Sequence, residues 1–234
     1  MNLHELKSEL RRIKALGYIE TKRGGSTGIG HTLEQVLSLE ENNLAIPDIG
    51  GRVELKATRK RSSSLITLFT FNNAVWKVPQ KEIVAQFGYK DQDKKRVNLY
   101  NTIWPNRVNS LGFLININNE EQRISMIDPT NRKVAEWNIY SLVAKFLNKF
   151  NTLFLFVLAD SRETNGKEEF HYNEAYLLKD TSPENFINAF QNSKVGLDLR
   201  MHIKPNGSIR NHGTGFRIHE NDFSELFSIK ERIL

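Results

Sequence analysis

Leucine and isoleucine recur at three- and four-residue steps between residues 3 and 16. That spacing places them on one face of an amphipathic helix, and Gly17 is a natural place for the helix to end. Glycines crowd residues 24–30 and predict a flexible loop. Helical spacing returns over residues 33–37, with Thr32 as the expected N-cap. The pattern therefore predicts a helix, a glycine loop and a second helix, in that order.

Further along, β-branched and aromatic residues predict strands at 53–57 and 65–71. The longest apolar run, 153–159, is typical of a central strand covered on both faces, with 170–178 as its neighbour. A mixed sheet flanked by helices in one α/β domain is the simplest architecture. The other expected strands are 111–117, 124–127, 134–137 and 195–203, and the other expected helices are 78–87, 140–150, 183–191 and a last one from about Asp222.

Composition limits the class of protein. The chain has 234 residues, of which 39% are hydrophobic and 26% charged, and this is typical of a globular domain rather than a disordered or fibrous chain. Its longest apolar run is far shorter than the ~18 residues that span a bilayer, and no hydrophobic signal region opens it. We therefore expect a cytoplasmic protein with no membrane partner. Without cysteine, any metal must bind to oxygen or imidazole.

The charge balance adds a hint about partners. Lys and Arg total 33 against 27 Asp and Glu, which gives a formal net charge of +6. Basic clusters at Lys22-Arg23, Arg59-Lys60-Arg61 and Lys94-Lys95-Arg96 stand in polar, loop-like surroundings from which side chains can reach phosphates. The alternative is an ordinary solvated surface, and charge alone does not decide between the two.

The segment with the clearest chemistry runs from Asp48 to Lys56. Side chains alternate along a strand, so Glu54 and Lys56 project together while Leu55 turns towards the core. The Gly50-Gly51 pair allows the chain to fold back, so that the Asp48 carboxylate approaches Glu54. Two close carboxylates suit a hard divalent cation such as Mg²⁺, which also accepts phosphate oxygens. The alternative is an exposed Glu54–Lys56 ion pair with Asp48 as a turn residue.

The flanking residues carry a specific resemblance. The segment from Gly17 to Asp48 resembles the amino-terminal half of the MvaI/BcnI restriction endonucleases, relatives of the mismatch-repair nickase MutH in the PD-(D/E)XK nuclease superfamily. The residues that carry it are Gly17-Tyr18, Glu20-Thr21-Lys22-Arg23, Gly24 to Glu34, Glu41-Asn42-Asn43-Leu44 and Pro47-Asp48, followed in order by Leu65 to Phe69, Phe87-Gly88-Tyr89, Arg107 to Gly112, Glu174 to Leu178 and His212 to Ile218.

This resemblance implies a fold and a catalytic site. The expected fold is a PD-(D/E)XK, MutH-like core in one domain, 1–234, with a DNA cleft between a catalytic and a recognition lobe. The catalytic motif falls within 20–71. In that superfamily, residues matching Asp48 and Glu54 bind Mg²⁺, here joined by the Leu55 carbonyl, and Lys56 is the third catalytic residue. Glu34 would be an accessory acid that orients water or Lys56, although from the sequence alone it is an ordinary helix-surface acid.

DNA contacts are expected in several regions of the chain. Backbone amides of the glycine segment can cradle a phosphate, and a DNA phosphate fits better than ATP because no P-loop lysine follows; the alternative is a flexible hairpin. The resemblance assigns base recognition mainly to 195–219, where arginine suits guanine and Asp198 can accept from cytosine N4. The expected contacts are Lys22, Arg23 and Thr27 at the glycine segment, Arg59 in a basic cluster, Arg107 and Asn109 in a polar loop, and Asp198, Arg210, His212 and Arg217.

Some residues depart from the family pattern or carry no assigned role. Arg210-Asn211 stands where the family has His-Asp, and Thr70-Phe71 replaces a polar pair, so we expect a different central-base preference. His202 and His219 are interpreted as surface histidines, and Trp76 and Trp104 as packing residues.

The leading interpretation is a monomeric Type II restriction endonuclease that cuts duplex DNA at a short CC-x-GG-like site with Mg²⁺, leaving 5′-phosphate ends. A cognate DNA methyltransferase is implied as a system partner. The alternatives are a MutH-like strand-specific nickase and a catalytically inert, sequence-specific DNA-binding protein.

Overall fold

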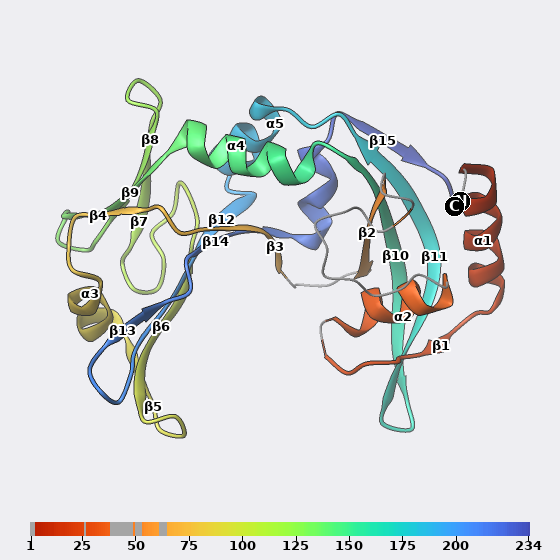
Figure 1. Cartoon of the computed structure of the whole chain (residues 1–234), viewed down its shortest axis with the longest axis horizontal. Helices are drawn as coiled ribbons and strands as arrows, with labels where there is room; N and C mark the ends of the chain where they lie inside the picture. Colours follow the sequence, from red (N-terminus) through yellow and green to blue (C-terminus); the bar gives the residue numbers. More distant parts are fainter. Residues whose placement is uncertain (1–2, 26, 38–48, 50–52, 61–64) are drawn as a thin grey trace. The chain divides into compact units, whose positions relative to one another are not determined.

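The structure, a computed structural model, describes residues 3–25, 27–37, 49, 53–60 and 65–234. The chain divides into two compact units, whose elements are labelled in Figure 1. Several sheets flanked by helices are present in the described ranges, where the sequence predicts one mixed sheet. Unit 1 comprises Met1–Ser63, Phe150–Ser182 and Ser224–Leu234, and unit 2 comprises Ser64–Lys149 and Pro183–Phe223.

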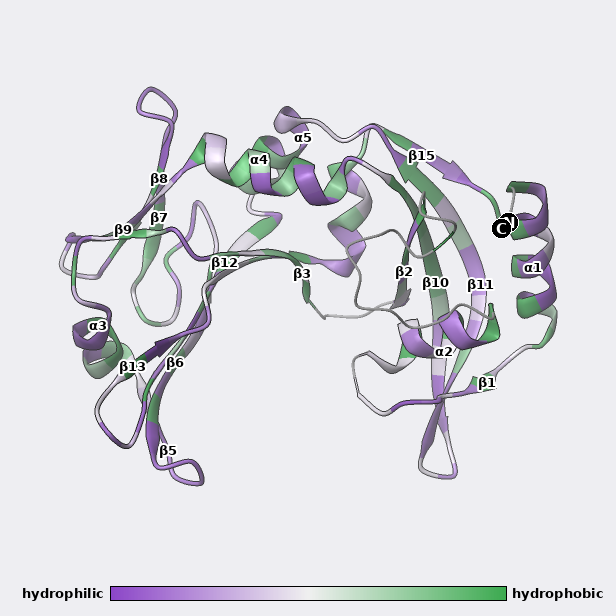
Figure 2. Cartoon of the chain, viewed as in Figure 1, coloured by the Kyte–Doolittle hydropathy of each residue, from purple (hydrophilic) through white to green (hydrophobic). Residues whose placement is uncertain are grey.

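Unit 1 is built on a 5-stranded mixed sheet in the order β1-β11-β10-β2, with β15 also paired to β11. β2 and β10 are parallel, and the other pairs are antiparallel. The apolar run at 153–159 lies in β10, and its hydrophobic colour changes to hydrophilic towards the hairpin with β11 (Figure 2). The strands are β1 Ile19–Glu20, β2 Val53–Arg59, β10 Leu153–Thr164, β11 Lys167–Lys179 and β15 Ile229–Arg232.

Helices α1 (Leu3–Ala15) and α2 (Gly28–Val36) both contribute to the core on one face of this sheet. α1 buries its predicted apolar stripe, and α2 buries Ile29 and Leu33 in the same cluster as Leu55 and Leu155. The predicted amphipathic pattern of the first helix is therefore confirmed. Because Leu55 belongs to this core, the residues on either side of it project from the opposite face of the sheet.

Unit 2 contains a 6-stranded sheet, order β3-β14-β12-β6-β5 with β13 paired to β12, and a 4-stranded sheet, order β4-β9-β8-β7. One face of the larger sheet is apolar: the Phe69 ring stacks on Phe216 and the α4 ring Phe146 stacks on the α5 ring Phe186, each at 4.9 Å. The elements are β3 Leu65–Phe71, β4 Val75–Trp76, α3 Gln80–Phe87, β5 Tyr89–Asp91, β6 Arg96–Ile103, β7 Leu114–Asn118, β8 Arg123–Ile127, β9 Lys133–Asn138, α4 Ile139–Phe150, α5 Pro183–Gln191, β12 Val195–Ile203, β13 Ile209–Asn211 and β14 Thr214–His219.

The start of α2 differs from the prediction. The helix begins at Gly28, so residues 28–30 of the predicted glycine loop are helical, and Thr32 lies inside the helix rather than at its cap. A Cβ on Gly28 would lie 2.1 Å from the Arg23 carbonyl oxygen. The glycine thus permits a close backbone approach at the helix start. Thr32 Oγ1 accepts a hydrogen bond from the Lys22 amide at 2.9 Å, which holds the preceding segment against the helix.

The carboxyl end also differs. The helix predicted from about Asp222 is a short 3-10 helix, η1 (Glu220–Leu226), followed by strand β15. β15 pairs with β11, with Arg232 opposite Tyr176. The last residues of the chain are therefore extended because they hydrogen-bond along β11. Strands β6, β13 and β14 were not predicted. None of the helices in the described ranges combines the length and hydrophobicity needed to cross a membrane.

Asp128 anchors the turn between β8 and β9 and makes this unit sensitive to acid. Its fully buried carboxylate accepts hydrogen bonds from Thr130 and Arg132. Burial alone would raise the pKa of Asp128, but these hydrogen bonds lower it to about 2. Because the pKa of Asp128 is lower in the folded protein, its ionised carboxylate stabilises the fold at pH values above the ordinary pKa of 3.8. This stabilisation is lost as the pH falls towards about 2.

We expect Asp128→Asn to reduce the free energy of unfolding by about 2–4 kcal/mol at neutral pH, since it leaves buried donors poorly paired. Urea unfolding at pH 7 and pH 3 measures this, and the difference from wild type should shrink at the lower pH. The exposed Asp93→Asn is the matched control. An equal loss at both pH values would contradict the assigned protonation.

Candidate active site and nucleic-acid interface

Glu54 and Lys56 project from one face of β2, as the sequence predicts. Leu55 between them is 6% exposed and belongs to the unit 1 core, whereas both charged side chains are partly exposed. The parallel register sets Glu54 beside Phe154 and Lys56 beside Phe156 on β10. A carboxylate and an ammonium group therefore share a surface whose neighbouring strand is apolar. Such surroundings strengthen electrostatic interactions with a bound charge.

Asp48, the other predicted metal ligand, lies outside the described residues. Its neighbour Ile49 is described: the Ile49 amide donates to the Val53 carbonyl at 2.9 Å, and the Val53 amide donates back at 3.3 Å. This antiparallel bridge joins the residue after Asp48 to the residue before Glu54. It agrees with the chain reversal that the Gly-Gly turn predicts.

The described donors suit a hard divalent cation. β2 is the last strand in the order of its sheet, and the Lys60 amide that follows it donates to Ala159 on β10 at 2.8 Å. Since backbone groups alternate along a strand, the Leu55 carbonyl points to the other side, away from β10. A carboxylate and a carbonyl oxygen are the ligand types that Mg²⁺ accepts. Within the described ranges, which omit Asp48, no cluster of three or more His, Asp or Glu forms a metal site.

Glu34, the predicted accessory acid, lies on α2 and is partly buried. A Cβ on Gly30 would lie 4.0 Å from Glu34 Oε1, so the side chain extends back over the preceding helical turn. α2 packs on the Leu55 face of the sheet, and Glu54 and Lys56 project from the other face. The role of Glu34 as an accessory acid stays a prediction.

An ionic network on the Glu54–Lys56 face escaped the sequence analysis. Lys60 Nζ lies 3.1 Å from Glu174 Oε2, and the Tyr176 hydroxyl donates to Glu174 Oε1. The Tyr176 hydrogen bond is the main reason why the pKa of Glu174 lies below its usual range, with burial opposing it and Lys60 assisting. Glu174 and Tyr176 stand in a segment that carries the family resemblance, and that was their only signal in the sequence.

The predicted phosphate contacts around the glycine segment divide into two kinds. Lys22, Arg23 and Thr27 have exposed side chains, as phosphate contacts require. Arg59 instead makes a two-pronged ion pair with Glu168, at 2.5 and 2.6 Å, and its guanidinium lies over the Phe170 ring. Arg59 Nη2 also donates to the Gly25 carbonyl at 3.3 Å. We therefore interpret Arg59 as the residue that ties the glycine segment to β11.

In unit 2, polar side chains line the face of the 6-stranded sheet opposite its aromatic core. Alternate residues of β12 from Leu197 to Met201 are buried in the core, so the residues between them project from the other side. The register with β6 sets polar residues beside them. We call this surface the polar face; its opposed pairs are Asp198 with Thr102, Arg200 with Tyr100, and His202 with Asn98.

Asp198 and Arg217, both predicted base contacts, belong to one ionic group. Asp198 is 7% exposed and accepts from Thr102 Oγ1 at 3.0 Å, and Arg217 Nη1 lies 3.4 Å from its other oxygen. Burial raises the pKa of Asp198, while Thr102 and the arginines oppose the rise. Arg217 Nη2 donates to the Leu65 carbonyl at 3.0 Å. The guanidinium is therefore fixed in orientation before any ligand binds.

Arg200 and His202 were missed by the sequence analysis. Arg200 Nη2 donates to Thr70 Oγ1 at 2.7 Å, which holds a partly exposed guanidinium on the polar face. His202 is 7% exposed, so interpreting it as a surface histidine was wrong, and its ring lies 5.4 Å from that of His212. Strand alternation supplies the missing signal, because residues 198, 200 and 202 share a face.

The polar loop after β6 carries two further predicted DNA contacts, Arg107 and Asn109, whose surroundings differ. Arg107 is exposed, with its guanidinium 5.1 Å from the centre of the Trp104 ring. Trp104 is 9% exposed and stacks on His219, in keeping with a packing role. Asn109 Oδ1 accepts from two loop amides and its Nδ2 donates to Asn101. Asn109 thus organises the loop, and Arg107 is the better placed to meet a ligand.

Comparison with known proteins identifies the relatives of this chain. The sequence profile of the MvaI/BcnI restriction endonuclease family matches residues 7–227. Restriction endonuclease MvaI in complex with cognate DNA substrate is similar at a TM-score of 0.76 and 29% identity, with 100% of both chains covered. MvaI in the absence of DNA has a TM-score of 0.60 and 28% identity, with 100% of this chain and 99% of that chain covered. No curated protein sequence matches.

The family match and the similarity to MvaI show an α/β fold of PD-(D/E)XK type and a Type II site-specific restriction endonuclease. The chain belongs to the MvaI/BcnI restriction endonuclease family. The membership predicted from the sequence motifs is thus confirmed. Enzymes of this class generally use divalent metal ions.

Proposed function

We propose that the protein is an Mg²⁺-dependent endonuclease that cuts both strands of duplex DNA at a short CC-x-GG-like site and leaves 5′-phosphate ends. The observation that carries this proposal is the pair formed by Glu54 and Lys56 on one face of β2, directly after the Ile49–Val53 bridge. The similarity to MvaI with cognate DNA supports duplex DNA as the substrate. The chain is proposed to act as one nuclease domain.

The catalytic roles follow from side-chain chemistry. Asp48, Glu54 and the Leu55 carbonyl would hold Mg²⁺, which supplies Lewis-acid stabilisation of charge at the scissile phosphate and lowers the pKa of water. Lys56 places an ammonium group on the same face, where it offsets negative charge that grows on the phosphoryl group. Lys60 is held by Glu174, so Lys56 is the cation on this strand assigned to the reaction.

The polar face is proposed to read base edges in the major groove. Its arginines can donate two parallel hydrogen bonds to guanine, which fits a site rich in G·C pairs. Arg217 and the Arg210–His212 segment are the assigned readers, together with Asp198. Arg107, Lys22, Arg23 and Thr27 are assigned to the DNA backbone. With one motif copy per chain, a monomer would cut the strands one after the other, and a methyltransferase of matching specificity would protect host DNA.

Plasmid digestion tests this function. Incubation of supercoiled plasmids with the protein and Mg²⁺ should yield discrete linear fragments, and EDTA should abolish them. Sequencing of the fragment ends then gives the site and the end chemistry. Open circles that never become linear would instead indicate a strand-specific nickase, and intact plasmid bound in a gel-shift assay would indicate an inert DNA-binding protein.

A further inference from the structure

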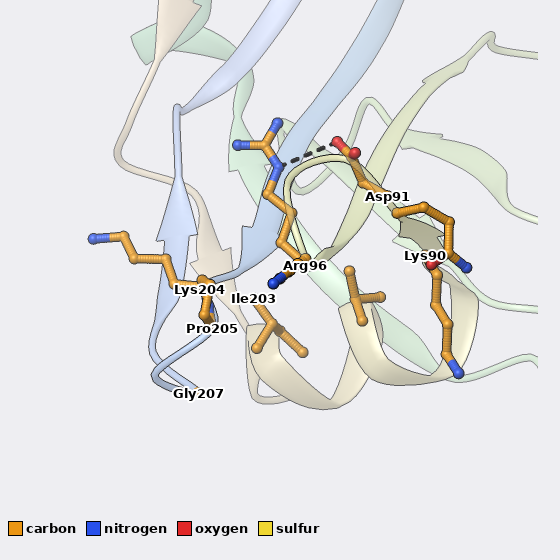
Figure 3. Close-up of a pocket in the computed structure, with 10 residues that line it drawn as sticks. Lys90, Asp91, Arg96, Ile203, Lys204, Pro205 and Gly207 are labelled. Atoms are coloured by element: carbon orange, nitrogen blue, oxygen red, sulfur yellow. Dashed lines mark ion pairs between the residues drawn. The ribbon is translucent and has the colours of Figure 1, made fainter.

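Most of the formal charge of the chain is concentrated in two short hairpins of unit 2. Residues 89–96 lie around the β5–β6 turn, and residues 200–212 around the β12–β13 turn. Together they hold seven Lys and Arg but only two Asp, a net charge of about +5 against +6 for all 234 residues. Residues of both hairpins line one pocket of about 450 Å³, so the two turns lie side by side (Figure 3).

Arg96 and Lys204 stand at the end of the polar face. The last pair of the β6–β12 register is Val97 opposite Ile203, directly after His202 opposite Asn98. Alternation therefore puts Arg96 and Lys204 on the same side as His202. Figure 3 shows Arg96 projecting from one side of the hairpin strands and Ile203 from the other.

The positive potential of this corner acts on the neighbouring histidines. Burial is the main cause that lowers the pKa of His202, and Arg96, Lys204 and Arg210 lower it further. The pKa of His212 is lowered by burial and then by Arg210, Arg200 and Arg96. The Tyr100 hydroxyl lies 3.5 Å from His202 Nδ1, and the His212 ring lies 5.4 Å from the His202 ring. Several cations thus converge at one end of the polar face.

Asp91 fixes the geometry of this corner. Its carboxylate accepts from the Lys94 amide at 3.1 Å and from Asn98 Nδ2 at 3.0 Å, and Arg96 Nε lies 3.5 Å away. Figure 3 shows this ion pair between Arg96 and Asp91. Lys204 has an exposed side chain, and its backbone amide closes the second turn on Ser208 at 2.8 Å. Both turns are therefore held by hydrogen bonds, with the Lys204 side chain exposed and the Arg96 side chain 21% exposed.

We propose that Arg96 and Lys204 each make a sequence-independent contact with a DNA backbone phosphate beside the bases read by the polar face. This inference rests on the proposed DNA-cleaving function. Along a strand, residues on one face recur every ~6.6 Å, so these cations lie about 7–14 Å beyond the rows of His202 and Arg200. The major groove is about 12 Å wide, and phosphates form its walls. If the rows of Arg200 and His202 face base edges in the groove, the cations about 7–14 Å further along the strands reach a phosphate at the groove wall.

The salt dependence of DNA binding tests this contact. Fluorescence anisotropy with a labelled duplex that lacks any cleavage site, in EDTA, gives log Kd against log salt concentration. Loss of one phosphate contact reduces the slope by about 0.9 and weakens binding about five- to tenfold near 0.1 M salt. We expect this for Lys204→Gln, and a restored slope for Lys204→Arg. Arg96→Gln combined with Lys204→Gln should reduce the slope by about 1.8.

Lys145→Gln is the matched control, because Lys145 is an exposed lysine on α4, which packs on the apolar face of the same sheet. An unchanged slope for Lys204→Gln, or an equal reduction for Lys145→Gln, would overturn the inference. The same purified proteins are tested for plasmid cleavage. If wild type cleaves no plasmid while the slopes change as expected, the proposed function fails and the phosphate contact holds.

Discussion

Replacement of Lys56 by alanine is expected to lower kcat for plasmid cleavage by about 10³-fold or more, with DNA affinity within about twofold of wild type. The reason is the position of its ammonium group, next to Glu54 on the β2 face and against apolar Phe156 on β10. There it acts on charge that appears only as the phosphodiester bond breaks. Single-turnover cleavage, at protein concentrations well above Kd, measures the chemical step without product release.

Lys60→Ala is the matched control for that experiment, since Lys60 follows the same strand and is paired with Glu174. We expect its single-turnover rate to stay within about threefold of wild type, because removal of a partly exposed ion pair costs about 1 kcal/mol or less. If Lys56→Ala cleaved as fast as Lys60→Ala, Lys56 would have no part in the chemistry.

Glu54→Gln is expected to abolish cleavage to a similar extent, by about 10³-fold or more, through a different step. The amide has the shape of the carboxylate but lacks its charge, so it weakens the hold on a hard divalent cation. Titration calorimetry with Ca²⁺ or Mg²⁺ in the presence of uncleaved DNA should show the divalent affinity falling. The fold itself should be retained, because the Glu54 side chain is partly exposed.

Glu163→Gln removes an exposed carboxylate from the β10–β11 hairpin of the same unit and should leave cation affinity and cleavage unchanged. Unchanged calorimetry for Glu54→Gln would remove Glu54 from the proposed ligand set, whatever the cleavage rate. Glu54→Gln tests binding of the cation and Lys56→Ala tests stabilisation of the transition state, so the two variants together separate these roles.

The elements that the sequence predicts well are those whose burial is complete or periodic. The apolar run of β10 predicts a strand covered on both faces, and the helical stripe of α1 predicts a helix with one buried face, since no other arrangement buries these residues. The strands β6 and β14 were missed for the opposite reason. In β6, the positions on the other side from the polar face are Val97, Leu99, Asn101 and Ile103, so a polar residue interrupts the apolar alternation that would have marked the strand.

The same distinction applies to the site. Glu54 and Lys56 are two residues apart, so the period of a strand alone puts them together. The Glu174–Lys60 pair joins strands far apart in the sequence, and Arg59 finds its partner Glu168 at 109 residues' separation. No local pattern encodes such partners, because they depend on the register of β10 and β11.

By itself, the sequence determined the family, the strand that carries Glu54 and Lys56 and most of the buried framework, since these follow from motif order and local periodicity. The tertiary structure alone decided which polar residues are available for DNA. It committed Arg59 and Asn109 to internal contacts, buried His202, and brought Arg96 and Lys204 to one corner. The physical reason is that a side chain's exposure and partners depend on strand pairing between distant segments.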